Sequence, residues 1–265
     1  MKTAVFIPAR TKSTRLPNKA LLEIKGKPVI EHLIDRVKLA KLPDLIVLCT
    51  TINPEDVILG RIAERNNISH FQGSEKDILN RYLKAAFKYK VDFIVNADGD
   101  DVFCDPEYID RVIELFIQTG ADFIKCEGLP FGVAPSGIKV KALEKICKNK
   151  AVTNTETGWS RYFTEPGLFK VQYLEVEDED LRHPEIRLTL DYPEDYEFFK
   201  EVFERLYVPG EVFTLKEIMV LLKNNPSITD LNKDLQKEYW ETFQRKAQEI
   251  QWKKQGTNEI PNKRP

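Results

Sequence analysis

Short, uniformly apolar runs alternate with longer amphipathic segments in the first half of the chain. Apolar residues in the longer segments recur every three or four positions, which predicts helices, whereas the short runs predict strands that are buried on both faces. The predicted strands are 4–7, 45–48, 93–95 and 122–126. The predicted helices are 28–39, 54–66, 77–89 and 105–116. This alternation predicts an α/β fold with a Rossmann-like, mostly parallel sheet and right-handed crossovers.

The pattern becomes irregular after residue 126. Two segments without periodicity, 130–137 and 152–167, are predicted to be substrate-facing loops. The predicted elements that follow are a strand at 186–190, helices at 193–206 and 214–222, a long charged helix at 231–253 and a solvated tail at 256–265. We therefore expect an α/β domain over residues 1–225, followed by a helical C-terminal extension with a flexible tail over 226–265.

Composition adds limits on the class of protein. Apolar residues make up 42% of the 265 positions and charged residues 31%, as in globular domains, and the net charge of −2 argues against a large nucleic-acid surface. The four cysteines form no CxxC pair, so we expect reduced thiols rather than a zinc site or disulfides. No apolar run approaches the roughly 18 residues that span a bilayer, and no leader-like region precedes the first strand. These features predict a cytoplasmic protein with no nucleic-acid and no membrane partner.

A basic loop, residues 8–19, follows the first predicted strand. Its candidate phosphate-binding side chains are four cations and two hydroxyls: Arg10, Lys12, Ser13, Thr14, Arg15 and Lys19. Ligands of open α/β sheets bind at the carboxyl ends of the strands, so we expect these groups to face a site. Cations and backbone N–H groups suit phosphate oxygens. The alternative is a solvated basic turn. This interpretation is the weaker one, because four cations lie together at the end of one strand.

An acidic turn, residues 98–101, follows the third predicted strand. At least one of its carboxylates should reach the same cleft as the basic loop, where it can ligate Mg²⁺ together with substrate phosphates. For Asp101 we favour a solvated or helix-capping role. The order Asp98-Gly99-Asp100 also fits the Asp-x-Asp metal motif of a glycosyltransferase, although a nucleoside-diphosphate donor needs fewer cations than the basic loop provides.

Four segments, 7–19, 73–82, 99–106 and 187–195, together resemble the cytidylyltransferases that make CMP-activated acidic sugars such as CMP-Kdo and CMP-sialic acid. The similarity is greatest to the branch named for spore coat polysaccharide biosynthesis, and it covers roughly residues 3–125 and 186–225. Two positions depart from the family, which commonly has Gly where this chain has Lys12 and Asn18. Asn tolerates a left-handed backbone, whereas Lys12 either adds a cation near the phosphates or points outward.

This resemblance implies the sheet of the nucleotide-diphospho-sugar transferase type. It also implies transfer of CMP from CTP to a sugar acid or phosphorylated acceptor, with release of pyrophosphate. Arg10, Arg15 and Lys19 would then bind the triphosphate and stabilise the leaving pyrophosphate as catalytic residues. By the same resemblance, Asp100 and Asp191 would hold Mg²⁺.

The nucleotide-binding residues that the basic loop and the resemblance indicate are Pro8, Ala9, Arg10, Ser13, Thr14, Arg15, Lys19, Thr50, Thr51, Gln72, Ser74, Arg81 and Asp98. Ordinary hydrogen bonding at a strand end is an equal alternative for Thr50 and Thr51. A solvated position on a helix surface is the alternative for Arg81.

The segment 155–165 is the part of the expected cleft that least resembles the family. Trp159 can form an apolar wall for the acceptor there, and Arg161 can bind an acceptor carboxylate or phosphate. A lid or a dimer contact is the equal alternative. We expect a homodimer, as in similar enzymes. Two rival functions are a metal-dependent glycosyltransferase of related architecture and a non-catalytic nucleotide-binding protein.

Overall fold

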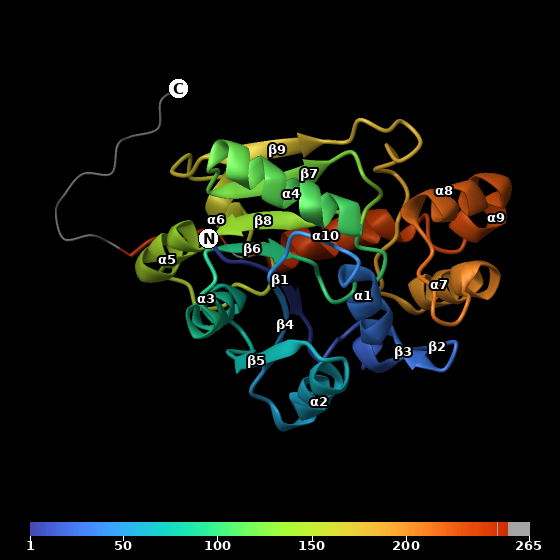
Figure 1. Ribbon diagram of the computed structural model, residues 1–265, viewed down its shortest axis with the longest axis horizontal. Coiled ribbons are helices and arrows are strands. Elements are labelled where there is room, and N and C mark those ends of the chain that lie inside the picture. Colours follow the sequence, from blue (N-terminus) through green and yellow to red (C-terminus); the bar gives the residue numbers. More distant parts are fainter. Residues whose placement is uncertain (248, 254–265) are drawn as a thin grey trace.

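A seven-stranded sheet with helices on both faces forms the body of the protein, as a computed structural model shows (Figure 1). The structure describes residues 1–247 and 249–253. The strand order is β5-β4-β1-β6-β8-β7-β9. The expected Rossmann-like, mostly parallel sheet is therefore confirmed, while the expected tail at 256–265 lies outside the described residues.

The parallel half of the sheet is centred on β1 (Thr3–Pro8), which pairs with β4 (Leu45–Thr51) on one side and β6 (Phe93–Asn96) on the other. β5 (Ser69–Gly73) continues the sheet beyond β4. Successive residues of β1 enter different cores, because alternate side chains of a strand point to opposite faces. Val5 therefore packs under one layer of helices and Phe6 under the other, which explains why the whole strand is apolar.

The other half of the sheet contains one reversed strand. β8 (Ser136–Lys139) lies antiparallel between β6 and β7 (Phe123–Glu127), and β9 (Val171–Glu175) pairs in parallel with β7 at the edge. The loop predicted at 130–137 is therefore too long, since its last two residues belong to β8. Glycine is not a residue that predicts a strand, which is why the sequence pattern does not indicate β8 at Gly137. The strand nevertheless requires a glycine there, because a Cβ would lie 2.5 Å from the Phe93 ring.

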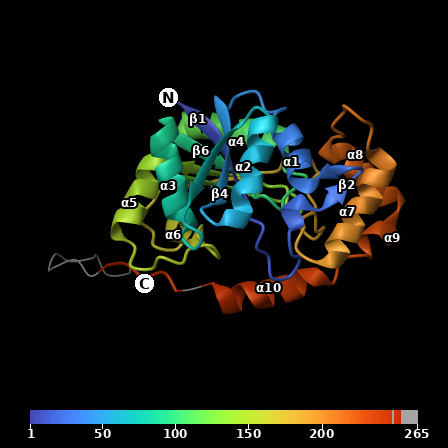
Figure 2. The same cartoon turned by 90° about the horizontal axis from the view of Figure 1, so that it is seen from below.

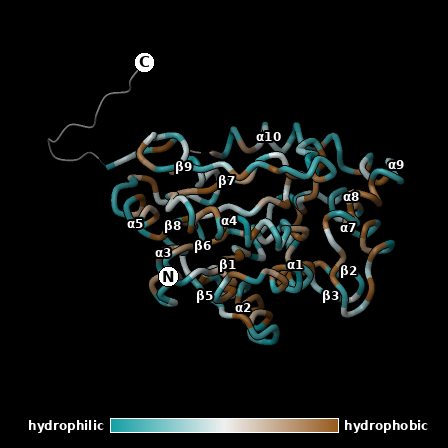
Figure 3. The backbone as a smooth tube through the Cα atoms, turned by 45° about the horizontal axis from the view of Figure 1, so that its top comes forward, coloured by the Kyte–Doolittle hydropathy of each residue, from teal (hydrophilic) through white to brown (hydrophobic). Residues whose placement is uncertain are grey.

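Two helical layers cover the sheet (Figure 2). One core packs against the first group of helices, α1 (Val29–Val37), α2 (Val57–Arg65), α4 (Pro106–Thr119), α7 (Pro193–Leu206) and α8 (Leu215–Asn224). The second core packs against α3 (Ile78–Tyr89), α5 (Val140–Asn149) and α6 (Arg161–Thr164). Hydrophobic residues (brown) accordingly lie in the central strands and in helices such as α1 and α2 (Figure 3).

Helix starts were among the most predictable features because their capping residues are visible in the sequence. Asp77 accepts the Asn80 N–H at 3.1 Å and Asp105 accepts the Glu107 N–H at 2.9 Å, which satisfies N–H groups that a helix start leaves unpaired. Thr214 and Glu217 form a reciprocal capping box at the start of α8.

Two predicted elements differ in the structure. The strand expected at 186–190 is an extended segment joined to residue 131 by one isolated bridge, so it is not part of a regular ladder. The long helix expected at 231–253 is shorter, because the chain forms α9 (Pro226–Thr229), then turns, and α10 covers only Leu235–Lys246. Residues 249–253 then run beside α5, where Ala151 N–H donates to Gln251 O at 2.8 Å.

None of the helices in the described part of the chain combines the length and the apolar character needed to cross a membrane.

Candidate functional site

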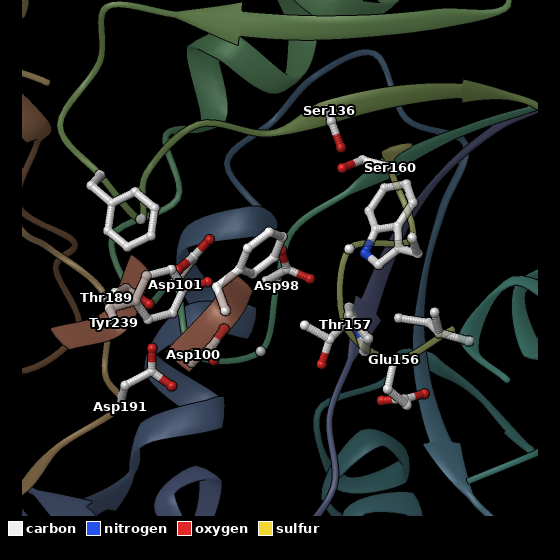
Figure 4. Close-up of a pocket in the computed structure, with 18 of the residues that line it drawn as sticks. Asp98, Asp100, Asp101, Ser136, Glu156, Thr157, Ser160, Thr189, Asp191 and Tyr239 are labelled. Atoms are coloured by element: carbon white, nitrogen blue, oxygen red, sulfur yellow. The ribbon is translucent and has the colours of Figure 1, made fainter. Parts of the chain in front are cut away.

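A cavity of about 1410 Å³ opens at the carboxyl ends of β1 and β6, where the basic loop and the acidic turn meet (Figure 4). This position agrees with the rule for ligand sites in open α/β sheets. The expected site residues that line the cavity are Pro8, Ala9, Arg10, Ser13, Thr14, Arg15, Lys19, Arg81, Asp98, Asp100, Trp159 and Asp191. The structure thus gathers three separate segments, 8–19, 98–101 and 189–191, around one space.

Lys19 joins the two expected metal ligands. It begins the 3-10 helix η1 (Lys19–Leu21), and its Nζ donates to Asp100 Oδ2 at 2.5 Å and to Asp191 Oδ1 at 2.9 Å. Burial opposes the charge of this ammonium, but Asp100 and Asp191 hold its pKa above the ordinary range. Arg15 also donates to Asp191 Oδ1, so two cations of the basic loop converge on one carboxylate. Asn18 adopts the left-handed backbone (φ 56°) that its residue type tolerates.

The other cations of the basic loop lie farther from these carboxylates. Lys12 pairs with Glu55 at 2.8 Å and keeps 59% of its side chain exposed, so it points outward at the rim of the cavity. Arg10 reaches the opposite wall, where its Nη1 lies 3.4 Å from Glu156 Oε2. Asp56 fixes the loop between them, because its Oδ1 accepts both the N–H and the hydroxyl of Thr11 at 2.7 Å.

The acidic turn is held against β1 by Gly99. A Cβ at this position would lie 2.4 Å from Pro8 O, so a glycine is required for the close approach of the two segments. Burial and then the neighbouring Asp100 raise the pKa of Asp98 to about 7. Burial together with Asp100 and Asp98 also raises the pKa of Asp101, which hydrogen bonds to Thr189. Asp101 is half-buried and its N–H closes the turn by donating to Asp98 O at 2.9 Å, so the turn expected for Asp101 is present, but its carboxyl group is not freely solvated. Asp98, Asp100 and Asp101 together form the carboxylate corner of the cavity.

Neighbouring cations hold Asp191 in its ionised form. Burial works against its charge, but Lys19 and Arg15 lower its pKa to about 2. Asp195 fixes its backbone, since Asp195 Oδ2 accepts the Asp191 N–H at 2.9 Å. Arg187 supports both acids, with its Nη2 3.4 Å from Asp191 Oδ2 and 2.9 Å from Asp195 Oδ2.

Two residues of this supporting network, Arg187 and Asn232, had no role in the sequence-based prediction. The side chains of Arg187 and Asp195 are fully buried and form a two-pronged ion pair, with Arg187 Nε 2.8 Å from Asp195 Oδ1. Asn232 donates from its Nδ2 to Asp195 Oδ1 at 2.9 Å. Arg187 lies in one of the family-like segments. Its spacing of four and eight residues from the acids Asp191 and Asp195 is the sequence signal that could have indicated it. Asn232 gave no such signal.

Five expected site residues do not line the cavity. Thr50 is buried, and its hydroxyl has no hydrogen-bond partner within residues 1–247 and 249–253, while Thr51 donates to Asp56. Gln72 is exposed on the edge strand β5, and Ser74 accepts the Asp77 N–H near the start of α3. Arg161 pairs with Glu165 at 2.5 Å along α6.

Arg81 is buried rather than solvated. Its Nη1 donates to Ser74 O at 2.6 Å, and its Nη2 lies 3.0 Å from Glu156 Oε1. Arg10 approaches the same glutamate, so Glu156 links the basic loop to α3. Trp159 lies nearby with its ring in edge-to-face contact with Tyr82 and Phe123, and it forms an apolar wall of the cavity.

The donor set at Asp100 and Asp191 suits a hard divalent cation. Carboxylate oxygens are the preferred ligands of Mg²⁺, and both groups already converge on one positive charge, the Lys19 ammonium. Among the described residues, no three His, Cys, Asp or Glu side chains are arranged to enclose a metal ion. A metal held here would therefore need phosphate or water oxygens as further ligands.

Comparison with known proteins places the chain in one family. The family model described as Cytidylyltransferase matches residues 4–238. The uncharacterized protein MJ1063 of Methanocaldococcus jannaschii is 34% identical over 246 residues, which cover 91% of this chain and 99% of the relative. The spore coat polysaccharide biosynthesis protein SpsF of Bacillus subtilis is 31% identical over 230 residues, which cover 83% and 94%.

A solved structure agrees with these relatives. The cytidylyltransferase from Leptospira borgpetersenii superposes with a TM-score of 0.78 at 29% identity, covering 86% of this chain and 97% of the other. The relatives and this neighbour bear out the resemblance to the cytidylyltransferases that was stated on segments 7–19, 73–82, 99–106 and 187–195. With a family model that spans most of its length and a cavity built from those segments, the chain belongs to the cytidylyltransferase family and is a nucleotidyltransferase.

Proposed function

We propose that this protein transfers CMP from CTP to a sugar acid or a phosphorylated acceptor and releases pyrophosphate. The observation that carries the proposal is the meeting of the basic loop with Asp100 and Asp191 around one cavity. Three cations and two carboxylates suit a metal-bound triphosphate, which carries several negative charges. Family membership favours this reaction over the glycosyl transfer that an Asp-x-Asp motif also allows, and over a non-catalytic role.

In this reaction an acceptor oxygen, from a hydroxyl of a sugar acid or from the phosphate of a phosphorylated acceptor, attacks the α-phosphorus of CTP. The new P–O bond forms as the bond to the β-phosphate oxygen breaks and pyrophosphate leaves; where the nucleophile is a hydroxyl, its proton passes to solvent. Arg10, Arg15 and Lys19 bind the phosphates and stabilise the charge that grows on the leaving group, as fixed cations do in a site that excludes water. Lys19 can serve this purpose because Asp100 and Asp191 keep it protonated.

We propose Mg²⁺ as the metal, with Asp100 and Asp191 as its protein ligands. When bound, such an ion neutralises phosphate charge and supports in-line displacement. Two other residues support these ligands: Asp195 holds the Asp191 backbone, and Gly99 allows the acidic turn to approach β1 closely. Since the Lys19 ammonium is paired with both carboxylates, ion binding requires that this ammonium turn toward the phosphates.

The nucleotide base is the part of the proposal that depends on family membership rather than on the cavity. Glu156, Arg81 and Arg10 form the wall beyond the basic loop, and Trp159 adds an aromatic face. We propose that the nucleoside lies along this wall, with the triphosphate over residues 8–19. The relative SpsF takes its name from spore coat polysaccharide biosynthesis, and we propose that this chain likewise serves the synthesis of a surface polysaccharide or glycoconjugate.

The proposed setting is a cytoplasmic homodimer without a nucleic-acid or membrane partner. Four free thiols, three of them buried, suit a reducing compartment. The edge strand β9 and the exposed Leu168 that precedes it offer a surface to a second copy. Light scattering of the purified protein measures the mass, and a monomer at micromolar concentration would reject the dimer.

The test is a pyrophosphate-release screen of CTP, UTP, ATP and GTP, each with Mg²⁺, against acidic and phosphorylated sugars. We expect release with CTP and one class of anionic acceptor. Release with UTP but not CTP would reject the proposed base. Asp100→Ala should abolish release, and unchanged release in that variant would reject the proposed metal site.

A further inference from the structure

Helix α10 closes one side of the cavity, although sequence analysis expected only an appended helix. Six of its side chains line the space: Gln236, Tyr239, Trp240, Thr242, Phe243 and Lys246. None of the residues of α10 is buried, so its aromatic rings border the cavity instead of filling a core. Aromatic side chains left in this position provide a face for a ligand.

The first half of α10 lies beside the carboxylate corner (Figure 4). The Tyr239 ring is 5.3 Å from the Arg15 guanidinium and 5.1 Å from the Phe131 ring. The second half lies against the opposite wall, because a Cβ at Gly158 would be 3.4 Å from the Phe243 ring. Trp240 lies between them, 5.6 Å from Phe131 and 43% exposed. The helix therefore spans the cavity from the proposed metal ligands to the loop at 154–160.

Contacts at both ends fix α10 in this place. Before the helix, buried Asn232 donates to Arg187 O at 3.2 Å. After the helix, Lys253 N–H donates to Asn149 O at 2.7 Å, and the Trp252 ring packs on Tyr162 with 5.6 Å between centroids. A segment tied down on both sides is a wall of the site rather than a loose tail.

The geometry of an in-line displacement indicates which substrate lies against α10. In an in-line displacement the acceptor approaches the α-phosphorus from the side opposite the leaving pyrophosphate. The proposed pyrophosphate ligands Arg10, Arg15 and Lys19 all belong to the basic loop. The acceptor therefore occupies the part of the cavity away from that loop, which is bordered by α10 and by β7 and β9.

Side chains in that part of the cavity match an anionic sugar. Trp240 and Tyr173, the latter 50% exposed, present aromatic faces, which pack well on the apolar C–H face of a sugar ring. Lys246 of α10 lines the same cavity, is exposed, and carries an ammonium group that suits a carboxylate or phosphate. Lys125 of β7 also lines the cavity, but its Nζ is already paired with Glu127 Oε1 at 2.9 Å. Ser136 and Ser160 add hydroxyl groups for hydrogen bonds to the ring substituents.

We propose that α10 forms the acceptor subsite, with Trp240 stacking on the sugar ring and Lys246 binding its carboxylate or phosphate. This inference rests on the proposed nucleotidyl transfer and names the part of the chain that selects the acceptor. Both residues lie beyond residue 238, where the match to the family model ends.

The experiment compares wild type with Trp240→Ala, Trp240→Phe and Lys246→Ala, and uses Lys237→Ala as the matched control. Lys237 lies on the same helix and is exposed but does not line the cavity. Pyrophosphate release is measured with CTP and Mg²⁺ against 3-deoxy-manno-octulosonate, N-acetylneuraminate and glucose 1-phosphate, with glucose as the neutral control. The acceptor that supports release is then used for all variants.

We expect Lys246→Ala to raise the acceptor KM roughly tenfold or more, the loss expected for one hydrogen bond to a charged group, with the KM for CTP changed by less than about twofold. Trp240→Ala should do the same, and Trp240→Phe should restore most of the affinity because it keeps an aromatic face. Lys237→Ala should match wild type. Equal acceptor KM values in wild type and Lys246→Ala, or a parallel rise in the KM for CTP, would overturn the subsite.

A second measurement separates this inference from the proposed function. If wild type releases no pyrophosphate with any of these acceptors, the proposed function fails, but binding of the same three anionic sugars can still be followed by saturation-transfer NMR. Binding that is lost in Lys246→Ala and kept in Lys237→Ala supports the subsite. Absence of binding to wild type, or binding that Lys246→Ala leaves unchanged, rejects it.

Discussion

Asp195 holds Asp191 in position through the backbone, since the Asp191 N–H donates to Asp195 Oδ2 at 2.9 Å. The same carboxylate forms the two-pronged ion pair with Arg187, and both side chains of the pair are fully buried. Asp195 therefore has three roles: it caps the first turn of α7, pairs with the charge of Arg187 and orients a proposed metal ligand. A buried charge left without its partner is costly, so the position can be tested directly.

Asp195→Asn should lower the free energy of unfolding by about 3–5 kcal/mol, because it leaves the Arg187 charge buried and unpaired. It also turns an amide N–H toward groups that are themselves donors. Urea unfolding measures the loss, and pyrophosphate release should fall as well because Asp191 loses its support. Glu194→Gln is the control, since Glu194 is an exposed acid of the same helical turn and its loss should cost at most about 1 kcal/mol. Equal stability of the two variants would contradict the prediction.

The two lysines of the basic loop should differ sharply in function. Lys19 contacts Asp100 and Asp191, whereas Lys12 pairs with Glu55 at the rim. Lys19→Ala should lower kcat for pyrophosphate release by roughly 10²-fold or more, as removal of a preorganised charge from a transition state does. Lys12→Ala should change kcat by less than about twofold, because exposed ion pairs contribute little. A large loss in Lys12→Ala would show that this side chain reaches the phosphates during catalysis.

Four of the seven strands, β1, β4, β6 and β7, and the positions of the two charged loops could be predicted because strand and helix patterns are local, whereas β5, β8 and β9 were not predicted. An apolar run such as 4–7 places the basic loop at its end, and the run at 93–95 places the acidic turn next to it. Parallel strands then bring both to one edge. The paired roles of Asp100 and Asp191 came from the family resemblance, since nothing local connects residues so far apart in the chain.

Contacts made by the C-terminal extension could not be predicted. Tyr239, Trp240 and Phe243 share one face of α10, but this face borders a cavity instead of packing on a core, so their spacing alone did not indicate what they contact. Asn232 reaches Asp195 only because the chain folds back over the site. Thr51 was predicted to contact the nucleotide because it lies at a strand end. In the structure its hydroxyl donates instead to Asp56, a contact that the sequence pattern does not reveal.

Gly99 should be irreplaceable for the position of the acidic turn. A Cβ there would meet Pro8 O at 2.4 Å, so Gly99→Ala forces the turn away from β1. We expect a loss of about 1–3 kcal/mol in unfolding free energy from the overpacking, together with a loss of activity as Asp100 moves. Gly60→Ala is the control, because its nearest neighbour, the His70 ring, is at an ordinary 3.4 Å. Alanine in that helix should be neutral or stabilising by up to about 1 kcal/mol.

His32 should make stability depend on pH below neutrality. Its Nε2 lies 2.9 Å from Ile24 O, and burial lowers its pKa below 6.5 despite that carbonyl, with Lys27 acting in the same direction. Because the unfolded chain binds the proton more readily, the stability present above pH 6.5 is lost as the pH falls toward the lowered pKa of the folded state. The slope from this group is at most about 1.4 kcal/mol per pH unit.

His32→Gln should remove that component of the slope, since glutamine can still donate to Ile24 O but does not titrate. Urea unfolding at several pH values between about 5 and 7.5, the range in which histidine titrates, gives the comparison. His183→Gln serves as the control, because His183 lies at the surface, 2.9 Å from Glu185, and a surface substitution should leave the slope close to that of wild type. If His32→Gln kept the full slope of wild type, His32 would not be the source of the acid sensitivity.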